Sequence, residues 1–259
     1  MSSHKIPHAT YLLMRHAATA AILVLIWQAL SLAAGPEVLP PPVESFKLLW
    51  GQMQGQEFWG HALASIRRLA LGMASASAIA FPIGLALGQS RRLDRLLAPA
   101  VFMTYPIPKI VFLPVLFVML GMGDASRALL IALATGYQIL VIVRSTAKSL
   151  DPSYAKAARQ MGAGQMALMR HVYLPAALPS FLTSLRVASG TATAVLFMAE
   201  SFATNEGLGC LIMDAWGVGD TEAMFTGIIA LCALGMTLYA LLGCAEWLLC
   251  PWARRQIAP

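Results

Sequence analysis

The chain has 259 residues, of which 58% are hydrophobic and only 12% are charged, and its mean hydropathy is +0.69. Soluble domains carry roughly 25% charged residues, so this chain has about half of the charge that a water-exposed surface needs. A soluble protein is therefore excluded. The net charge of +6 does not indicate nucleic-acid binding, because the basic residues lie in short clusters between apolar segments and form no single patch.

The N-terminal part predicts one membrane helix and one interfacial helix. Residues 17–34 are apolar and long enough for a membrane helix. A cleaved signal peptide is the alternative, because Ser31-Leu32-Ala33 resembles a signal-peptidase site. After the proline-rich residues 35–42, residues 43–60 contain Phe and Trp side chains that favour the headgroup level, which predicts an interfacial helix.

The next two apolar segments differ in their helix breakers. Residues 69–88 predict a span rich in Gly and Ala, including Gly84-x-x-x-Gly88, a spacing that lets helices pack closely. The alternative is that these small residues are merely common in membrane helices. Residues 96–120 cannot form one straight helix, because each proline removes a backbone donor. The sequence therefore predicts a broken span at four prolines: Pro99, Pro106, Pro108 and Pro114.

Three further spans, residues 128–143, 178–199 and 223–249, bring the total to six and the fold class to an all-α polytopic membrane protein. Cytoplasmic loops of membrane proteins are enriched in Lys and Arg. Twelve fall on one side: Lys5, Arg15, Arg91, Arg92, Arg95, Arg144, Lys148, Lys156, Arg159, Arg170, Arg254 and Arg255. The other side has Lys47 and Arg127 with nine carboxylates: Glu37, Glu44, Glu57, Asp124, Glu200, Glu206, Asp214, Asp220 and Glu222. Both termini are therefore predicted to be cytoplasmic.

Motifs for catalysis are missing from the sequence. It has no Gly-x-x-x-x-Gly-Lys-Ser/Thr phosphate loop and no His-Glu-x-x-His zinc motif. The cysteines lack the short paired spacing of a metal site, so we expect packing roles for Cys210, Cys232, Cys244 and Cys250. We expect no catalytic residue and no metal site in this chain.

The segment 151–175 between the fourth and fifth spans predicts two short helices. Asp151-Pro152 is a typical helix start, and Gly162 and Gly164 end a helix over residues 153–161. A second helix is expected over residues 165–171. In the first helix, small or apolar side chains share one face: Tyr154, Ala157, Ala158 and Met161. This face suits insertion into a groove of another protein, and packing against the chain's own helices or the headgroups is the alternative.

The same segment resembles a known motif. Ala157-Ala158, three residues, Gly162, nine residues and then Val172-x-Leu174-Pro175 resembles the "EAA" loop of the membrane subunits of type I ATP-binding-cassette (ABC) importers. In that family the loop is a coupling helix that docks into a separate ATPase. The first position, usually Glu, is Lys156 here. The resemblance implies these coupling residues: Tyr154, Ala157, Ala158, Met161, Gly162, Leu174 and Pro175.

The resemblance extends over residues 62–252. There the chain is similar to the branch of the family that imports nitrate, taurine and alkanesulfonates, which also includes permeases for pyrimidine vitamin precursors. Its further motifs are Arg67-Arg68, Pro106-x-Pro108, Leu113-Pro114, Gly121-x-Gly123, Ala199-Glu200 and Gly207-Leu208-Gly209. It implies a transmembrane domain over residues 61–250, preceded by an N-terminal helix and interfacial segment, 1–60, and followed by a cytoplasmic tail, 251–259.

The resemblance also implies partners and a location. These are an ABC ATPase dimer, which binds the ATP, a periplasmic or lipid-anchored binding protein, and a second copy of the chain in the bacterial inner membrane. No cofactor of its own and no nucleic acid are expected. The acidic loop, 200–222, with Trp216, is a candidate docking surface for the binding protein, with a merely solvated loop as the alternative.

Charged residues within or beside the spans are candidates for the path of an anionic solute: Arg67, Arg68, Lys109, Arg186 and Glu200. The alternatives are headgroup contacts for Arg67 and Arg68, and for Lys109 and Arg186 pairing with each other, with Glu200 or with free carbonyls. The competing functions are an ion-coupled carrier and a membrane assembly protein, and the competing substrate is a vitamin precursor or another small neutral solute.

Overall fold

The computed structural model describes residues 8–253, and all secondary structure in that range is helical. Lys5, Arg254, Arg255 and most of the predicted tail, 251–259, lie outside the described residues. Five helices are long and apolar enough to cross a membrane, and a sixth span arises if a bent pair counts as one. The long helices are α1 (His8–Ala34), α3 (Gln56–Gln89), α6 (Asp124–Ser149), α9 (Leu174–Glu200) and α11 (Thr221–Leu249). The prediction of about six spans is confirmed.

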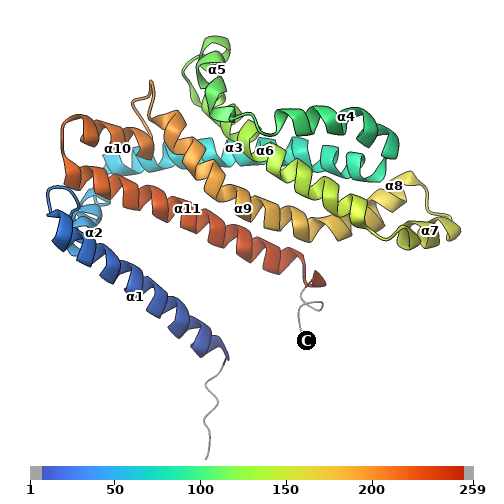
Figure 1. The fold of residues 1–259 in the computed structure, drawn as a ribbon, viewed down its shortest axis with the longest axis horizontal. Coiled ribbons are helices and arrows are strands. Elements are labelled where there is room, and N and C mark those ends of the chain that lie inside the picture. The colour runs from blue at the N-terminus through green and yellow to red at the C-terminus, as the bar shows by residue number, and fades with distance from the viewer. Residues whose placement is uncertain (1–7, 254–259) are drawn as a thin grey trace, which may run out of the picture.

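Shorter helices cap both ends of this bundle. In Figure 1, α3, α6, α9 and α11 run along the long axis of the molecule. At one end lie α2 (Pro42–Gln52) and α10 (Leu208–Gly217). At the other lie α7 (Pro152–Gln160), α8 (Gln165–Leu168) and a π-helical turn, η2 (Met169–Tyr173). Charged and glycine-rich connections therefore gather at the two ends, away from the apolar middle.

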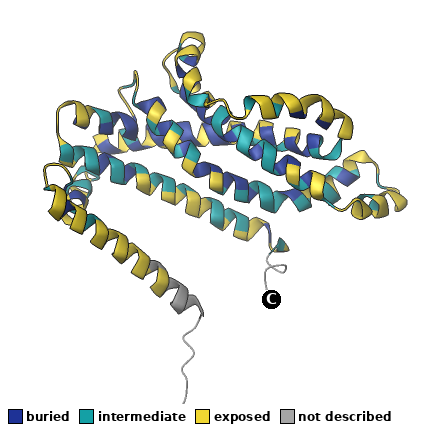
Figure 2. Ribbon diagram, viewed as in Figure 1, coloured by how far each residue is buried: buried dark blue, intermediate teal, exposed yellow. Residues whose placement is uncertain are grey.

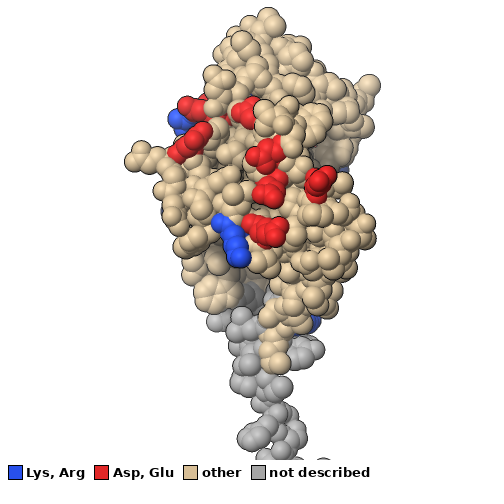
Figure 3. All heavy atoms as spheres, turned by 90° about the vertical axis from the view of Figure 1, so that its left-hand side faces the viewer, with Lys and Arg blue, Asp and Glu red and all other residues tan. Residues whose placement is uncertain are grey.

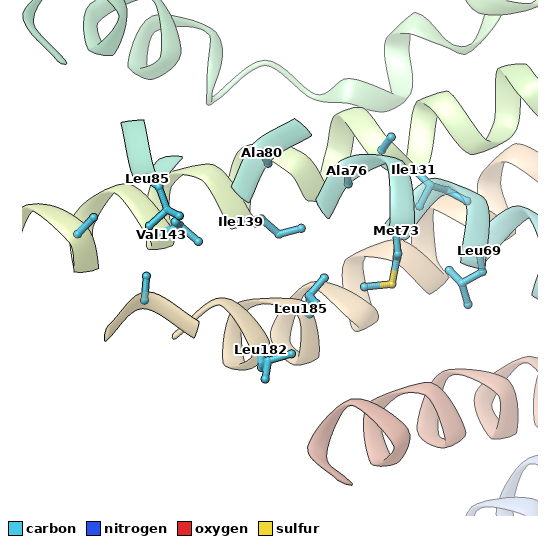
Figure 4. Close-up of a cluster of buried hydrophobic side chains, with 14 of the residues drawn as sticks. Leu69, Met73, Ala76, Ala80, Leu85, Ile131, Ile139, Val143, Leu182 and Leu185 are labelled. Atoms are coloured by element: carbon cyan, nitrogen blue, oxygen red, sulfur yellow. The ribbon is translucent and has the colours of Figure 1, made fainter. Parts of the chain in front are cut away.

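The core is built where α3 packs against α6 and α9, with Leu69, Ile131, Ile139, Val143 and Leu182 among its members (Figure 4). Glycines allow α3 and α6 to approach closely. A Cβ on Gly72 would lie 2.6 Å from Ile131 Cβ, and one on Gly84 would lie 3.0 Å from Val143 Cβ. A Cβ on Gly88 would overlap Ala147. The small residues of the second span therefore have the packing role that their spacing predicts.

The third span is broken, as its prolines predict. Helix α4 (Arg91–Thr104) is followed by η1 (Lys109–Phe112) and α5 (Leu113–Leu120), which turn away by 85°. Lys109 Nζ caps the break by donating to the carbonyls of Thr104 at 2.6 Å and Ile107 at 2.8 Å. The free carbonyls at the end of α4 are thus satisfied without continuing the helix.

The second span begins earlier than hydropathy predicts. The predicted interfacial helix, 43–60, ends at Gln52, and residues 56–60 already belong to α3. Phe58 and Ala62 of this added segment are buried one helical turn apart, as is Leu69 at the start of the predicted span. Arg67 and Arg68 lower its average hydropathy, which is why the sequence hides its membrane character.

Helix α1 diverges from the bundle. It packs chiefly on α2 near its C-terminal end, where Trp27 Nε1 donates to the carbonyl of Pro40 at 3.0 Å. Most of its described side chains are exposed, including Leu25 at 67% and Leu32 at 78% (Figure 2). An all-round apolar helix of this kind needs lipid or another protein around it.

Candidate functional site

Helix α7 has the cap and the stop that its sequence predicts. The Asp151 side chain accepts a hydrogen bond from the Ser153 amide at 2.8 Å, which lowers the pKa of the carboxyl. Pro152 occupies the first turn, where its missing N–H costs nothing. Gly162 ends the helix with φ = +85°, a conformation that favours glycine.

The predicted face of α7 is uncovered. No residue of α7 is buried, and the helix contacts only α8 and η2 substantially. Tyr154 is 62% exposed and Met161 is 82% exposed, whereas Ala158 is half-buried. The helix therefore does not pack this face against the chain's own long helices.

The second predicted helix, 165–171, is helical throughout, but it has no break before the fifth span. Helix α8 ends at Leu168, and the π turn η2 continues directly into α9 at Leu174. Pro175 has no N–H to donate one turn back, so the standard ladder cannot continue there. Leu174 and Pro175 thus lie in a continuous helical segment that joins α8 to the membrane helix α9.

A buried ion-pair network joins α3, α6 and α9 near the end of the molecule opposite α7. Arg68 is 3% exposed and Glu200 is 1% exposed, and Arg68 Nη1 lies 2.8 Å from Glu200 Oε1. Arg68 Nε also donates to Asp124 Oδ1 at 2.6 Å, and Arg67 pairs with the second oxygen of Asp124. Ser65 Oγ donates to both Glu200 oxygens, at 2.9 Å and 2.8 Å.

This network corrects two expectations. Arg68 lies in the middle of α3, so it does not reach the headgroups from a helix end. Glu200 is the last residue of α9, so it does not belong to a solvated acidic loop, and residues 208–217 of that loop form α10. Its charge is neutralised inside the protein, which the sequence does not reveal.

Arg127 requires a further correction, since its position before an apolar segment suggested an exposed loop. It lies in α6 and is 1% exposed. It donates to backbone carbonyls in the segment before α6 and at the end of α9. The acceptors are Met122 at 2.6 Å, Ala203 at 2.6 Å, Gly123 at 3.0 Å, Ala199 at 3.1 Å and Phe202 at 3.1 Å. Arg127 therefore ties the end of α9 to the start of α6.

Two more carboxylates pair with cations that the sequence assigned to loops or left open. Arg144, counted as a loop residue, lies in α6 and donates to Asp94 Oδ1 at 2.5 Å, while Lys148 Nζ donates to Asp94 Oδ2 at 2.7 Å. Arg186 Nη1 lies 3.3 Å from Glu246 Oε2. The expected partner of Arg186 was Lys109, Glu200 or a carbonyl, so Glu246 is a residue that sequence reasoning missed.

Arg186 lines a cavity between two long helices. Its side chain is 33% exposed and lines a largely apolar cavity of about 1010 Å³ between α9 and α11. Its guanidinium lies 5.3 Å from the ring of Tyr239, and its Nε is buried without a hydrogen-bond partner. A guanidinium has five N–H donors and its ion pair here is with Glu246, so terminal donors remain for an acceptor that enters the cavity.

The end of the molecule opposite α7 carries an acidic surface (Figure 3). Exposed carboxylates come from the α1–α2 connection, α2, the start of α3 and the segment after Glu200: Glu37, Glu44, Glu57, Glu206, Asp214, Asp220 and Glu222. Trp216 is 64% exposed in the same region. The acidic surface is thus larger than the predicted loop, although Glu200 is not part of it.

The cysteines of the described part are free thiols, with Cys210 and Cys250 buried and Cys232 and Cys244 exposed. Burial raises the pKa of Cys210 to about 11, with a further contribution from Asp214, to which its Sγ donates at 3.2 Å. Within residues 8–253, no three His, Cys, Asp or Glu side chains are grouped to hold a metal ion.

These features define a multi-pass helical membrane protein with a broken span and an exposed helix at one end. The family described as "Binding-protein-dependent transport system inner membrane component" matches residues 78–246. The chain therefore belongs to this family and is a type I ABC importer permease of the taurine and sulfonate branch.

Three relatives illustrate the similarity, at 30–31% identity. The taurine transport system permease protein TauC of Escherichia coli (strain K12) is 30% identical over 241 residues, which cover 90% of this chain and 88% of TauC. The putative aliphatic sulfonates transport permease protein SsuC of Bacillus subtilis (strain 168) is 30% identical over 83% of this chain and 79% of SsuC. The riboflavin transport system permease protein RibX of Chloroflexus aurantiacus is 31% identical over 90% and 88%.

The fold is similar to that of the MetNI methionine ABC transporter in inward-facing conformations. The TM-score is 0.62 at 19% identity, covering 72% of this chain and 93% of the solved chain.

Proposed function

We propose that the chain forms the transport path of an ATP-driven importer in a bacterial inner membrane, for a small anion of the taurine or sulfonate type. Two copies enclose one path, a separate ATPase dimer drives it, and a periplasmic or lipid-anchored binding protein delivers the solute. The exposed helix α7 is the observation that carries this proposal, because an uncovered face of small side chains suits insertion into another protein. Family membership and the relatives TauC and SsuC support the solute class.

The proposed coupling face consists of Tyr154, Ala157, Ala158, Met161 and Gly162, and Leu174 and Pro175 pass its movement to α9. The test is Ala158→Arg, which places a long charged side chain on that face. The matched control is Gln160→Arg, which adds the same charge on the polar face of α7. We expect Ala158→Arg to insert normally but to lose uptake and co-purification of the ATPase, whereas Gln160→Arg retains both. Retention of both by Ala158→Arg would refute ATPase docking on this face.

The proposed orientation has α7 and both termini in the cytoplasm. Removing the buried Arg127 and Arg144 from the loop count leaves the bias of Lys and Arg toward the α7 end unchanged. The acidic surface then faces the periplasm, where it suits a binding protein with basic side chains on its docking face. Labelling an introduced cysteine at Ser153 only in opened vesicles supports this orientation, and labelling in intact cells contradicts it.

The proposed solute contact is Arg186. The other inner cations are occupied: Arg68 by two carboxylates, Arg67 by Asp124 and Lys109 by carbonyls. Arg186 has one long ion pair, with Glu246 at 3.3 Å, and lines the large cavity between α9 and α11. A charge-assisted hydrogen bond contributes about 1.5–3 kcal/mol, so Arg186→Gln should reduce uptake of labelled taurine by at least about tenfold.

The control for Arg186→Gln is Arg170→Gln, which removes an exposed cation outside the cavity and should leave uptake unchanged. Unchanged uptake in Arg186→Gln would refute the anion contact. Uptake of riboflavin without uptake of taurine would instead favour the solute class of RibX. An ion-coupled carrier would continue transport after ATP depletion and would retain no ATPase on purification.

A further inference from the structure

A groove with small residues on its floor lies beneath α4. The cavity has a volume of about 430 Å³ between α4 and the surface of α3 and α6, and almost all of its lining is apolar. Alanines and a glycine form its floor: Ala76, Ala80, Ala132 and Gly136. A Cβ on Gly136 would lie in ordinary van der Waals contact with α3, 3.8 Å from Ala76 Cβ and 4.0 Å from Ala80 Cβ, so alanine fits there and a longer side chain does not. Leu97 and Val101 form the wall on α4.

The groove has the length of one lipid chain. Its lining on α3 extends from Ala76 to Leu87, which at 1.5 Å per residue is about 16 Å. One leaflet of the hydrocarbon core is about 15 Å thick, half of roughly 30 Å. An empty apolar groove would forfeit dispersion contacts, and in a membrane the filler at hand is an acyl chain.

One end of the groove is strongly basic. Leu87 and Leu97 both line the groove and flank the turn at Ser90 that joins α3 to α4. Three exposed arginines follow this turn and form no ion pair within residues 8–253: Arg91, Arg92 and Arg95.

Two more cations stand at the same end, on α6. Arg144 and Lys148 share a single carboxylate, Asp94, and Lys148 remains 56% exposed. Leu140, which lines the groove, lies one turn before Arg144 on α6. Five cations and a single paired carboxylate, Asp94, therefore lie near the end of the groove. This excess charge complements a phosphate at the membrane surface, and each such cation is expected to raise binding about fivefold.

We propose that the groove beneath α4 binds an anionic phospholipid, with an acyl chain between α4 and α3/α6 and the headgroup phosphate at the basic turn. The acyl chain supplies apolar contact with the groove, and the cations select a headgroup of negative charge. Neither part depends on the solute or on the ATPase.

The test uses the full chain in detergent with dioleoyl phosphatidylglycerol or dioleoyl phosphatidylcholine, whose acyl chains are identical. Native mass spectrometry counts the lipids that stay bound. The charge variant is Arg91→Gln/Arg92→Gln/Arg95→Gln, and its matched control removes three other cations of the same end: Lys156→Gln/Arg159→Gln/Arg170→Gln. The groove variant is Gly136→Leu, with Gly136→Ala as its control.

We expect the unmodified chain to retain phosphatidylglycerol at least tenfold over phosphatidylcholine. The charge variant should lose this preference, and the matched control should keep it. Gly136→Leu should bind less of both lipids at unchanged helicity, and Gly136→Ala should bind as the unmodified chain does. Equal loss in the control triple would show diffuse surface attraction and overturn the proposal.

Two other outcomes would overturn it. Full lipid retention by Gly136→Leu would mean that the acyl chain of the lipid binds elsewhere. Displacement of the lipid by glycerol phosphate alone would mean that the site binds free phosphate. Cross-linking between two copies through Leu97→Cys, in a background without the native cysteines, would show that a second copy covers the groove.

Discussion

Removing the Glu200 carboxylate should destabilise the protein strongly, although Glu200 lies at the end of a span. Its side chain is fully buried and accepts hydrogen bonds from Ser65 Oγ, from Arg68 Nη1 at 2.8 Å and from the Gly209 amide at 3.0 Å. Glu200→Ala leaves Arg68 with part of its charge unpaired inside the protein. Breaking a buried pair costs about 3–5 kcal/mol.

The lower end of that range applies, because Arg68 keeps Asp124 and the carbonyl of Glu206 at 2.7 Å. A loss of about 3 kcal/mol corresponds to a melting temperature lower by roughly 6–12 °C for a protein of this size. Glu200→Gln keeps the shape but not the charge and should lose about 1–3 kcal/mol. Both shifts are measurable by thermal unfolding of the purified protein in detergent.

The matched control is Glu222→Ala, which removes an exposed carboxylate at the same end of the molecule. Its effect should stay within about 0.5 kcal/mol, or less than roughly 2 °C. If Glu200→Ala shifts the melting temperature no more than Glu222→Ala does, the reasoning about the buried pair is wrong. If Glu200→Gln behaves as the unmodified chain, its shape matters and its charge does not.

Three other predictions follow from the packing and the caps. Gly88→Ala should destabilise by about 1–3 kcal/mol because its Cβ overlaps α6, whereas Gly60→Ala in the same helix, with nothing within 4 Å, should stabilise by up to about 1 kcal/mol. A Gly88→Ala variant that melts as high as Gly60→Ala would contradict the close packing. Lys109→Met should cost about 1–3 kcal/mol by freeing the carbonyls at the end of α4, and an unchanged melting temperature would mean that the lysine does not hold the bend. Because burial raises the pKa of Cys210 to about 11, its thiol stays protonated at neutral pH. The alkylation rate of Cys210 should be lower than that of the exposed Cys232 and should rise about tenfold per pH unit up to pH 11. Equal alkylation rates of the two cysteines at pH 7.5 would show that Cys210 is accessible as a thiolate.

The helical elements were largely predictable because their signals are local. Prolines forced the break after α4, and Asp151, Pro152 and Gly162 set the bounds of α7 within a residue or two. Hydropathy located the spans, although it placed the start of α3 thirteen residues late, since Arg67 and Arg68 dilute the average there. Periodicity of buried apolar residues would have recovered that segment.

The partners of the charged residues were not predictable from the sequence. Arg68 and Glu200 are 132 residues apart, and Arg186 and Glu246 are 60 residues apart on different helices. An arginine beside an apolar segment has the same local sequence whether it lies in a loop, at the headgroups or in a buried pair. Arg127 and Arg144 were therefore assigned to loops.

The sequence by itself determined that the chain is a membrane protein, how many spans it has, where one of them breaks and which connection carries the exposed helix. Each of these follows from hydrophobicity, helix breakers or spacing within a few turns of chain. Only the tertiary structure decided which cations are neutralised, which faces a cavity and which surround the groove beneath α4. Ion pairs and cavities form between the surfaces of different helices, and how those surfaces meet depends on packing that no local sequence pattern encodes.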